Sequence, residues 1–580
     1  MKILIAKTAG FCMGVRRAVE MVLEAPDKHE GPICTYGPLI HNPQVLGLLE
    51  EKGITVCDRI PASGHGTVLI RAHGVPPQAK EGLREAGFQV IDATCPRVIR
   101  VQTIIRKHAA KGYASIIIGD RDHPEVVGLK GYAGDNGHVA ATLEELQQLP
   151  RFEQAIIVAQ TTQNTRLYDA IKTWASANRP HYKIYDTICD STEKRQAEVQ
   201  CLASQVDAVV VVGGKESGNT QRLYEVARNS GKPAFHVETE EELDLDDLGQ
   251  FRQIGVTAGA STPNWQIKKV CRALESAPYR RVVGWRRTLY RLQRGLLLTN
   301  IYVALGAGGL SYAAMHLQGL RHFLPHGLVA ILYVLSMHLL NHLTGGDADR
   351  YNDPGRAQFY KRYKWPLAFM AIAGGAGGLG IAMGAGLLPF GLLLVMSLLG
   401  LSYNLHILPP FLSGGRYGRI KDIPGSKTFL IAAAWGLVTT VMPALSETGR
   451  LGPDTLAVLA WTSSLVFART VFFDLLDMQG DRLVGRETLP IVLGQKRAMD
   501  LLKISLVLLV ALPAITSAIG LSTGLGFFLV IIPMALLTVI VAHEQGKILP
   551  GARLEFLAES HFILAGFIGF LWSLIVTGKP

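Results

Sequence analysis

Long apolar stretches fill the second half of this 580-residue chain and constrain its fold more than any other feature. About nine of them are long enough, at about 20 residues, to cross a bilayer as helices. They lie near residues 295–315, 326–345, 366–385, 387–407, 428–446, 455–475, 501–519, 524–543 and 558–577. The earlier sequence instead mixes charged residues with short apolar runs. We therefore expect a soluble first half (1–275), a basic linker (276–294) and an all-helical, polytopic membrane domain (295–580).

Positive charge lies beside the apolar stretches. The formal net charge is +11, and lysine and arginine concentrate in the junction 280–294 and around 350–364, 416–427, 482–497 and 547–553. This alternation is the positive-inside pattern, so we expect these loops and the whole first half on the cytoplasmic side of the cell (inner) membrane, with membrane lipids as partners. No basic groove with interleaved aromatic residues is present, so nucleic acid is not an expected partner.

Short apolar runs alternate with amphipathic segments in the first half, a pattern typical of α/β proteins with mostly parallel sheets. Three cysteines share a position in this pattern, because Cys12, Cys95 and Cys189 each follow a strand-like run and precede a helix-like segment. Cys95 lies 83 residues after Cys12 and 94 residues before Cys189, about the length of a small α/β unit each. The sequence therefore predicts three such units in a trefoil-like arrangement, with one thiol apiece and a central site where they meet.

The three thiols indicate metal chemistry. The N-terminal segment lacks the basic and long apolar regions of a secretory signal, so we expect the first half in the reducing cytosol. A thiol at the N-terminal end of a helix has a lowered pKa and favours the thiolate form. Three thiolates leave one iron of a 4Fe–4S cluster free to bind a substrate oxygen. The alternative is that each is an ordinary buried cysteine. This alternative is less favoured because three cysteines occupy equivalent positions.

Polar side chains follow the predicted strands in the same way. The residues in these positions are His41, His73, His123, Glu125, Thr161, Ser217, Asn219 and Ser261. Ligands of parallel sheets bind outside the carboxyl ends of the strands. Histidines, hydroxyls and an amide suit a diphosphate there, and Glu125 is a candidate proton donor. For His41 taken alone, the alternative of a solvated or capping residue is the more frequent case.

The ordered motifs of the first half resemble the 4-hydroxy-3-methylbut-2-enyl diphosphate reductase (LytB or IspH) family over essentially its whole length. The matching segments are 9–15 (AGFCMGV), 37–43 (GPLIHNP), 71–75 (RAHGV), 92–96 (DATCP), 122–126 (DHPEV), 160–162 (QTT), 186–189 (DTIC), 215–220 (KESGNT) and 258–263 (AGASTP). The resemblance implies reductive dehydroxylation of this allylic diphosphate to isopentenyl and dimethylallyl diphosphate, the last step of the non-mevalonate isoprenoid pathway. It also implies a ferredoxin or flavodoxin type of electron donor.

The resemblance assigns roles to individual residues. It implies that a 4Fe–4S cluster is held by Cys12, Cys95 and Cys189. Glu125 would deliver protons with help from His123 and Thr161. The diphosphate would be held by His41, His73, His123, Ser217, Asn219 and Ser261. The family usually has a second serine where this sequence has Gly218, so we expect one hydroxyl contact to be missing or replaced by water, with weaker substrate binding but an intact reaction.

Two acidic clusters lie at predicted cytoplasmic helix ends of the second half. They are Asp347, Asp349 and Asp353, and Asp474, Asp477 and Asp481. Carboxylates are scarce near membrane spans, so these clusters indicate a function. In each, two aspartates four residues apart are expected to face one side of a helix and share magnesium, which bridges to a diphosphate.

The predicted spans and the tail 477–490 resemble the UbiA family of membrane prenyltransferases. The resemblance implies Mg²⁺ at the acidic motifs and transfer of a prenyl group from a prenyl diphosphate to an acceptor in the membrane. The residues concerned are Asp349, Asp353, Asp477 and Asp481. The first motif departs from the family, since Gly345 and Gly346 stand where Asn and Asp commonly occur.

Each half has an alternative interpretation. The first half could be an iron–sulfur sensor that kept its cluster without turnover, although Glu125 and the complete set of thiols favour an enzyme. The second half could be a membrane anchor only, although an anchor has no use for paired aspartates.

Overall fold

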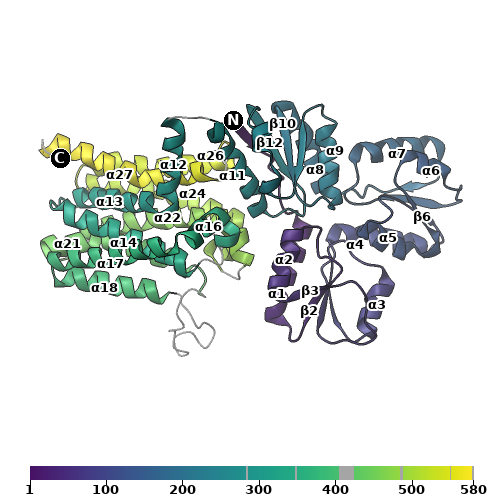
Figure 1. The fold of residues 1–580 in the computed structure, drawn as a ribbon, viewed down its shortest axis with the longest axis horizontal. Coiled ribbons are helices and arrows are strands. Elements are labelled where there is room, and N and C mark those ends of the chain that lie inside the picture. The colour runs from purple at the N-terminus through teal and green to yellow at the C-terminus, as the bar shows by residue number, and fades with distance from the viewer. Residues whose placement is uncertain (282–284, 346–348, 404–422, 484–486, 549, 578–580) are drawn as a thin grey trace. The chain divides into compact units, whose positions relative to one another are not determined.

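The computed structural model describes residues 1–281, 285–345, 349–403, 423–483, 487–548 and 550–577 (Figure 1). The chain divides into two compact units, Met1–Pro278 and Tyr279–Pro580, and each is described here by itself. Some residues named above lie outside the described part of the chain. They are Asp347, Gly346 and the predicted basic segments 416–422 and 484–486.

The first unit contains three separate four-stranded sheets, and every strand pairing in them is parallel. The first sheet has the order β1 (Lys2–Ile5), β12 (Gln253–Ala258), β10 (Ala208–Val212), β11 (Ala234–Val237). The second has the order β3 (Ile54–Cys57), β2 (Ile33–Tyr36), β4 (Thr67–Ile70), β5 (Gln89–Asp92). The third has the order β7 (Gly137–Ala140), β6 (Ala114–Ile118), β8 (Ala155–Ala159), β9 (Lys183–Ile184). The predicted α/β class with parallel sheets is confirmed.

Three helices connect the sheets in a cycle. Helix α1 (Met13–Lys28) leads from β1 to the second sheet, α4 (Pro96–Ala109) leads from β5 to the third, and α8 (Asp190–Gln205) returns from β9 to the first. The remaining helices cover the sheets. They are α2 (Pro43–Glu51), α3 (Pro77–Glu85), α5 (Pro124–Ala133), α6 (Leu143–Gln148), α7 (Thr165–Asn178), α9 (Gly218–Arg228), α10 (Leu245–Leu248) and α11 (Asn264–Arg281), with short 3-10 turns at Gly134–Asn136 and Glu240–Glu242.

The central strands are buried on both faces, as expected for parallel sheets covered by helices. Strands β4, β6, β8 and β10 consist entirely of buried residues. This fixes the ends of the strands, and the loops that follow them, on a rigid frame. The loops after β2, β4, β6, β8, β10 and β12 carry the polar residues singled out from the sequence.

The second unit is helical throughout its described residues. Its helices are α12 (Trp285–Leu298), α13 (Ile301–Leu317), α14 (Phe323–Thr344), α15 (Asp349–Asn352), α16 (Pro354–Arg362), α17 (Lys364–Ala385), α18 (Leu387–Ser402), α20 (Ser426–Gly436), α21 (Met442–Thr448), α22 (Pro453–Leu483), α23 (Leu489–Leu493), α24 (Gln495–Ala518), α25 (Gly526–Leu529), α26 (Ile531–Glu544) and α27 (Ala552–Thr577). A π-helical stretch, Leu437–Val441, joins α20 to α21.

Seven helical segments in the described part of this unit are long and apolar enough to cross a membrane, and an eighth is obtained if the bent pair α12 and α13 counts as one span. The pair bends by 73° between residues 298 and 301. Helix α18 is apolar but shorter, and the described segment that contains it ends at Tyr403. The structure therefore confirms a polytopic helical domain, and the predicted number of about nine is approximate.

Candidate active sites

The three predicted cysteines occupy the same position on their helices. Cys12, Cys95 and Cys189 are the residues immediately before α1, α4 and α8, and all three line one cavity of about 90 Å³. The Cys12 sulfur accepts a hydrogen bond from the Val15 amide at 3.5 Å. Because each thiol ends the loop after an edge strand of a different sheet, the cycle of sheets brings the three sulfurs to one place.

Gly14 allows α1 to approach the second thiol. A Cβ at this position would lie 2.4 Å from the Cys95 sulfur, which no side chain could accept. Burial raises the pKa of the Cys95 thiol, and this outweighs the hydrogen bonds from the first amides of α4. The expectation that the helix end lowers the thiol pKa is therefore wrong for Cys95, because desolvation is the larger effect. A bound cation would reverse this balance.

The other cysteines lie away from the cavity lining. Cys271 is buried in α11 and Cys201 is exposed on α8. Cys34 and Cys57 lie on the neighbouring strands β2 and β3, with their sulfurs 2.9 Å apart. The sequence pattern of strand, thiol and helix thus separates the three cavity cysteines from the rest.

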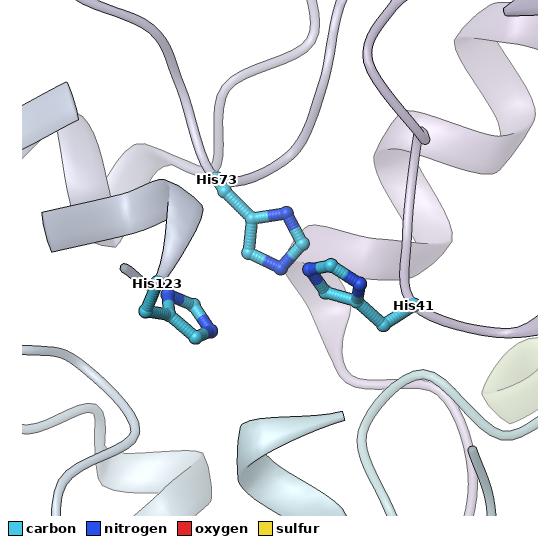
Figure 2. Close-up of side chains that lie close together, drawn as sticks. All are labelled: His41, His73 and His123. Carbon is cyan, nitrogen blue, oxygen red and sulfur yellow. The ribbon is translucent and has the colours of Figure 1, made fainter. Parts of the chain in front are cut away.

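Three histidines converge in the same cavity (Figure 2). His41, His73 and His123 follow β2, β4 and β6, and their ring centroids lie 4.9, 5.4 and 6.0 Å apart. One ring nitrogen from each lies within 4.8 Å of the others, so the cluster could hold a metal ion or bind an anion through N–H groups. His41 Nε2 and His73 Nδ1 are buried without a hydrogen-bond partner among the described residues.

Burial keeps these histidines neutral. It lowers the pKa of His123 to about 4 and lowers the pKa of His73 well below its ordinary value, and the neighbouring histidines and Arg71 add to the effect. The pKa of His41 is lowered for the same reasons, burial first and Arg71 second. A neutral ring carries one N–H donor, and buried polar atoms are rarely left unpaired, so the unpartnered nitrogens of His41 and His73 suit a polar ligand in this cavity.

The first sheet contributes hydroxyl and amide groups to this cavity. Ser217 and Ser261, after β10 and β12, lie with their hydroxyl oxygens 3.1 Å apart. Both polar side-chain atoms of Asn219 are buried and unpartnered among the described residues. Ser217 also precedes α9, whose first amides favour anions. A Cβ at Gly218 would lie 3.4 Å from His123 Cδ2 and Nε2, an ordinary contact, so this glycine leaves a space that a small side chain could fill.

Glu125 lies in the first turn of α5 and is only 2% exposed. Its carboxylate accepts hydrogen bonds from the Thr161 amide at 2.7 Å and from the Thr161 hydroxyl at 2.8 Å. Burial nevertheless raises the pKa of Glu125 to about 7, since desolvation of the charged form exceeds the stabilisation by Thr161. A carboxyl group with this pKa can store and release a proton near neutral pH.

Sequence reasoning missed two arginines. Arg97, on the first turn of α4, lines the cavity and forms an ion pair of 2.7 Å with Asp190 at the start of α8. Arg195, buried on α8, donates hydrogen bonds to the carbonyl oxygens of Gly10 and Ala258 at 2.6 and 3.0 Å. Arg195 therefore holds together the loops that carry Cys12 and Ser261. An arginine within two helical turns after each cysteine was the only local signal.

In the second unit, the two acidic segments meet. Helix α15 packs against α22, and the side-chain amide of Asn352 donates a hydrogen bond to Asp481 Oδ1 at 3.1 Å. Asp349 contacts His342 of α14 at 2.5 Å. Asp353 precedes α16 and accepts a hydrogen bond from the Arg356 amide at 3.0 Å.

One expectation about these aspartates is wrong. Asp349 begins α15, which ends at Asn352, whereas Asp353 lies between α15 and α16 as the N-cap of α16. The Asp353 backbone amide still donates a hydrogen bond to the Asp349 carbonyl at 2.8 Å. Asp477 and Asp481 do lie together on α22.

A cavity of about 380 Å³ lies between α14, α18 and α20 of the second unit. Its lining is largely apolar, with Met396, Leu399 and Trp435 among its members, and Asn341 and Lys427 are polar members. Lys427 lies 3.8 Å from Asp474 of α22, whose other oxygen accepts a hydrogen bond from Thr428 at 2.7 Å. The cavity thus combines an apolar wall with polar groups connected to the second acidic segment.

Comparisons with known proteins agree with both halves. Residues 3–275 match the family described as LytB protein, and residues 301–552 match the UbiA prenyltransferase family. The 4-hydroxy-3-methylbut-2-enyl diphosphate reductase of Oleidesulfovibrio alaskensis is 44% identical over 276 residues, which cover 47% of this chain and 98% of that protein. The enzyme of the same name from Clostridioides difficile is 39% identical over 279 residues, 48% of this chain and 100% of that protein.

A solved structure is similar to the second unit. It is a UbiA homologue from Archaeoglobus fulgidus, 18% identical, with a TM-score of 0.36 and coverage of 48% of this chain and 97% of that one. The fold and site of the first unit define a three-lobed α/β protein with thiols and histidines around one central cavity. The chain belongs to the 4-hydroxy-3-methylbut-2-enyl diphosphate reductase (LytB) family and carries a UbiA prenyltransferase domain in its membrane unit. Both resemblances stated from the sequence are confirmed.

Proposed function

We propose that the first unit reduces 4-hydroxy-3-methylbut-2-enyl diphosphate to isopentenyl and dimethylallyl diphosphate, with loss of the hydroxyl group as water. One observation carries the proposal: a single cavity is lined by the three thiols, the three neutral histidines and the Glu125–Thr161 pair. Two relatives whose sequences this chain covers almost completely are named for the reduction of this substrate. Their names support the same substrate for the first unit.

The donor set fits a 4Fe–4S cluster. The three sulfurs line one half-buried cavity, and Gly14 leaves space beside one of them that any side chain would fill. Cys12, Cys95 and Cys189 would hold the cluster, which supplies electrons and a Lewis-acidic iron when it is bound. Thiolate ligands suit iron–sulfur centres better than they suit magnesium or calcium.

The chain's own residues position the substrate and move the protons. The unpartnered nitrogens of His41 and His73, together with Asn219, would donate hydrogen bonds to the diphosphate. The paired hydroxyls of Ser217 and Ser261 add further donors. His123, which lies beside the space left by Gly218, would also bind the diphosphate.

Proton delivery is assigned to Glu125. Its carboxyl group, protonated below about pH 7, would release a proton toward the leaving hydroxyl. Thr161 donates hydrogen bonds to both carboxyl oxygens and so fixes their direction. The Nδ1 atom of His123 accepts a hydrogen bond from the Glu125 backbone amide at 3.1 Å. A sensor without turnover has no need of a buried proton donor, so Glu125 favours the enzyme over the sensor.

The experiment for the cluster is an iron count. Full-length chains with Cys12, Cys95 or Cys189 changed to serine should each lose most bound iron and the brown absorption after anaerobic purification. The variant Cys271→Ser, which changes a buried cysteine outside the cavity, is the matched control and should keep both. Equal iron in all four variants would remove the basis of the proposal.

We further propose that the membrane unit is a magnesium-dependent prenyltransferase. The contact between Asn352 and Asp481, which joins the two acidic segments, is the observation that supports it. Asp349, Asp353, Asp477 and Asp481 would share Mg²⁺, which bridges to the diphosphate of a prenyl donor. The apolar cavity beside Lys427 would hold the prenyl chain.

A transfer assay separates this activity from a membrane anchor. Membranes containing the chain should transfer label from radioactive prenyl diphosphates, with Mg²⁺ and a membrane extract as the source of acceptor. The Asp477→Asn variant should lose the transfer, while Asp454→Asn, at the opposite end of α22, should keep it. Equal labelling with both variants, or none with the wild type, would favour the anchor.

The arrangement in the cell completes the proposal. Residues 1–275 would form the reductase in the cytoplasm, 276–294 a basic linker, and 295–580 the prenyltransferase in the inner membrane. The positive-inside placement of arginine and lysine supports this orientation. A ferredoxin or flavodoxin would supply the electrons.

A further inference from the structure

Two large apolar side chains are exposed beside the thiol cavity. Met13, the residue after Cys12, is 66% exposed, and Ile99, one turn into α4, is 39% exposed. The first turns of α1 and α4 touch directly, because Gly14 lies against the Cys95 sulfur. Both apolar side chains therefore lie within one helical turn of this contact.

Basic residues are frequent at the starts of the same helices. The first two turns of the three helices that follow the cysteines carry Arg16, Arg17, Arg97, Arg100 and Lys194, besides the buried Arg195, and these outnumber the carboxylates Glu20, Asp190 and Glu193. Two contacts join the starts of these three helices. Arg17 donates a hydrogen bond to the Thr94 carbonyl at 3.1 Å, and Arg97 pairs with Asp190.

The proposed reduction needs a source of electrons close to the cavity that the three thiols line. The proposed step breaks one C–O bond, consumes two electrons and two protons, and releases water, so each product molecule requires two reduced one-electron carriers. Electron transfer slows steeply with distance, which favours docking where the thiols lie nearest the surface. All three cavity cysteines are partly exposed rather than buried.

We propose that the face formed by Met13, Ile99, Arg100 and Lys194 is the docking site for an acidic one-electron carrier protein. The inference rests on the proposed reductase function and adds the location of its partner. Electron-transfer complexes are weak and small, typically below about 1,200 Å² of buried surface, and two apolar side chains within a charged rim match that size. Complementary charge raises the association rate of such encounters.

Charge reversal on this face tests the proposal. The double variant Arg100→Glu/Lys194→Glu changes two exposed residues that do not line the cavity. The matched control, Arg106→Glu/Lys107→Glu, makes the same change in charge on exposed residues in the last turn of α4, about 9 Å further along the helix axis. The full chain is used in a zwitterionic detergent, with a strongly acidic flavodoxin as the probe.

Two readouts are compared. The first is the Kd of oxidised flavodoxin, measured by titration calorimetry at low salt, which does not depend on turnover. The Kd should rise about tenfold in the Arg100/Lys194 variant and stay unchanged in the control, and the wild-type Kd should rise with salt. The second is the turnover rate with reduced methyl viologen, a small donor that needs no docking face, which should be unchanged in both variants.

Other outcomes would contradict either the proposed docking site or the proposed reductase function, and the two cases can be told apart. An unchanged Kd in the Arg100/Lys194 variant, or an equal loss in the control, shows that flavodoxin binds elsewhere or through net charge alone. Loss of the methyl viologen rate in the same variant shows that these residues serve the cavity instead. If wild-type chain binds flavodoxin but does not turn over with either donor, the docking face stands and the reductase function fails. Met13→Gln is an independent variant, which should weaken binding without any change of charge.

Discussion

Substitution of Glu125 by glutamine should abolish most of the reductase activity. It should also abolish the decline of the activity as the pH rises above neutrality. Glutamine can keep both hydrogen bonds to Thr161, because its oxygen accepts from the amide and the threonine hydroxyl can turn to accept from its NH₂ group. The proton donor is lost, and removal of a general acid typically reduces rates by about 10²–10⁴-fold. The cluster thiols are untouched, so the brown colour should remain.

The pKa of Glu125 sets the pH profile of the wild type. With a folded pKa of about 7, the acid form predominates below neutrality and falls to about one tenth of the enzyme at pH 8. The value of kcat should therefore drop about fivefold from pH 7 to pH 8 and about tenfold from pH 8 to pH 9. The rise from the ordinary value of 4.5 corresponds to about 3 kcal/mol of stability that is present below pH 4.5 and lost as the pH rises through about 7. Glu125→Gln should show neither the decline in kcat nor this pH-dependent loss of stability.

The assay is anaerobic oxidation of reduced methyl viologen by full-length chain in detergent, at saturating substrate, from pH 6 to 9. The control is Glu144→Gln, which changes an exposed carboxylate of the same lobe and should behave as the wild type. A Glu125→Gln enzyme with the wild-type rate, or a wild-type rate that rises through pH 7, would refute the assignment of this carboxyl as the acid.

Four further substitutions test the binding sites. Gly218→Ser should lower KM about three- to tenfold with little change in kcat, because its side chain fits beside His123 and adds one hydrogen bond to the diphosphate, as measured by steady-state kinetics. His73→Ala should raise KM at least tenfold while iron content stays constant, because a buried donor to the diphosphate is removed. Asp481→Asn should abolish prenyl transfer and leave reductase turnover unchanged, whereas Asn352→Ala should raise the Mg²⁺ requirement for transfer, as a magnesium titration would show.

The local pattern of the sequence predicted much of the first site. A strand, a thiol and a helix follow one another at Cys12, Cys95 and Cys189, and this order is set by short-range propensity and capping. The loops after parallel strands open at one edge, which is why His41 and His73 could be expected near the same cavity. Their functional roles remain predictions.

Long-range pairing could not be read from the sequence. Strand β1 pairs with β12, about 250 residues later, so the N-terminal strand completes the sheet of the last segment rather than starting a unit of its own. No local signal specifies that register, since many apolar strands could pair. The contact of Asn352 with Asp481 is also non-local, since 129 residues separate the two, and no local pattern marked Asn352.

Electrostatic predictions failed where two effects compete. The field of the helix end suggested a lowered pKa for every cavity thiol, but the desolvation of Cys95 depends on packing that only the folded chain reveals. The break of the helix at Pro354 was visible in the sequence, and it explains why Asp353 is a cap and does not share a helix with Asp349.

The most direct test of the account is product analysis with the intact, anaerobically purified chain. Incubated with 4-hydroxy-3-methylbut-2-enyl diphosphate and reduced methyl viologen, it should be brown, consume two electrons for each substrate molecule, and form both isopentenyl and dimethylallyl diphosphate. A colourless chain with all cavity thiols free, or a brown chain that leaves the substrate unchanged with this donor, would contradict it.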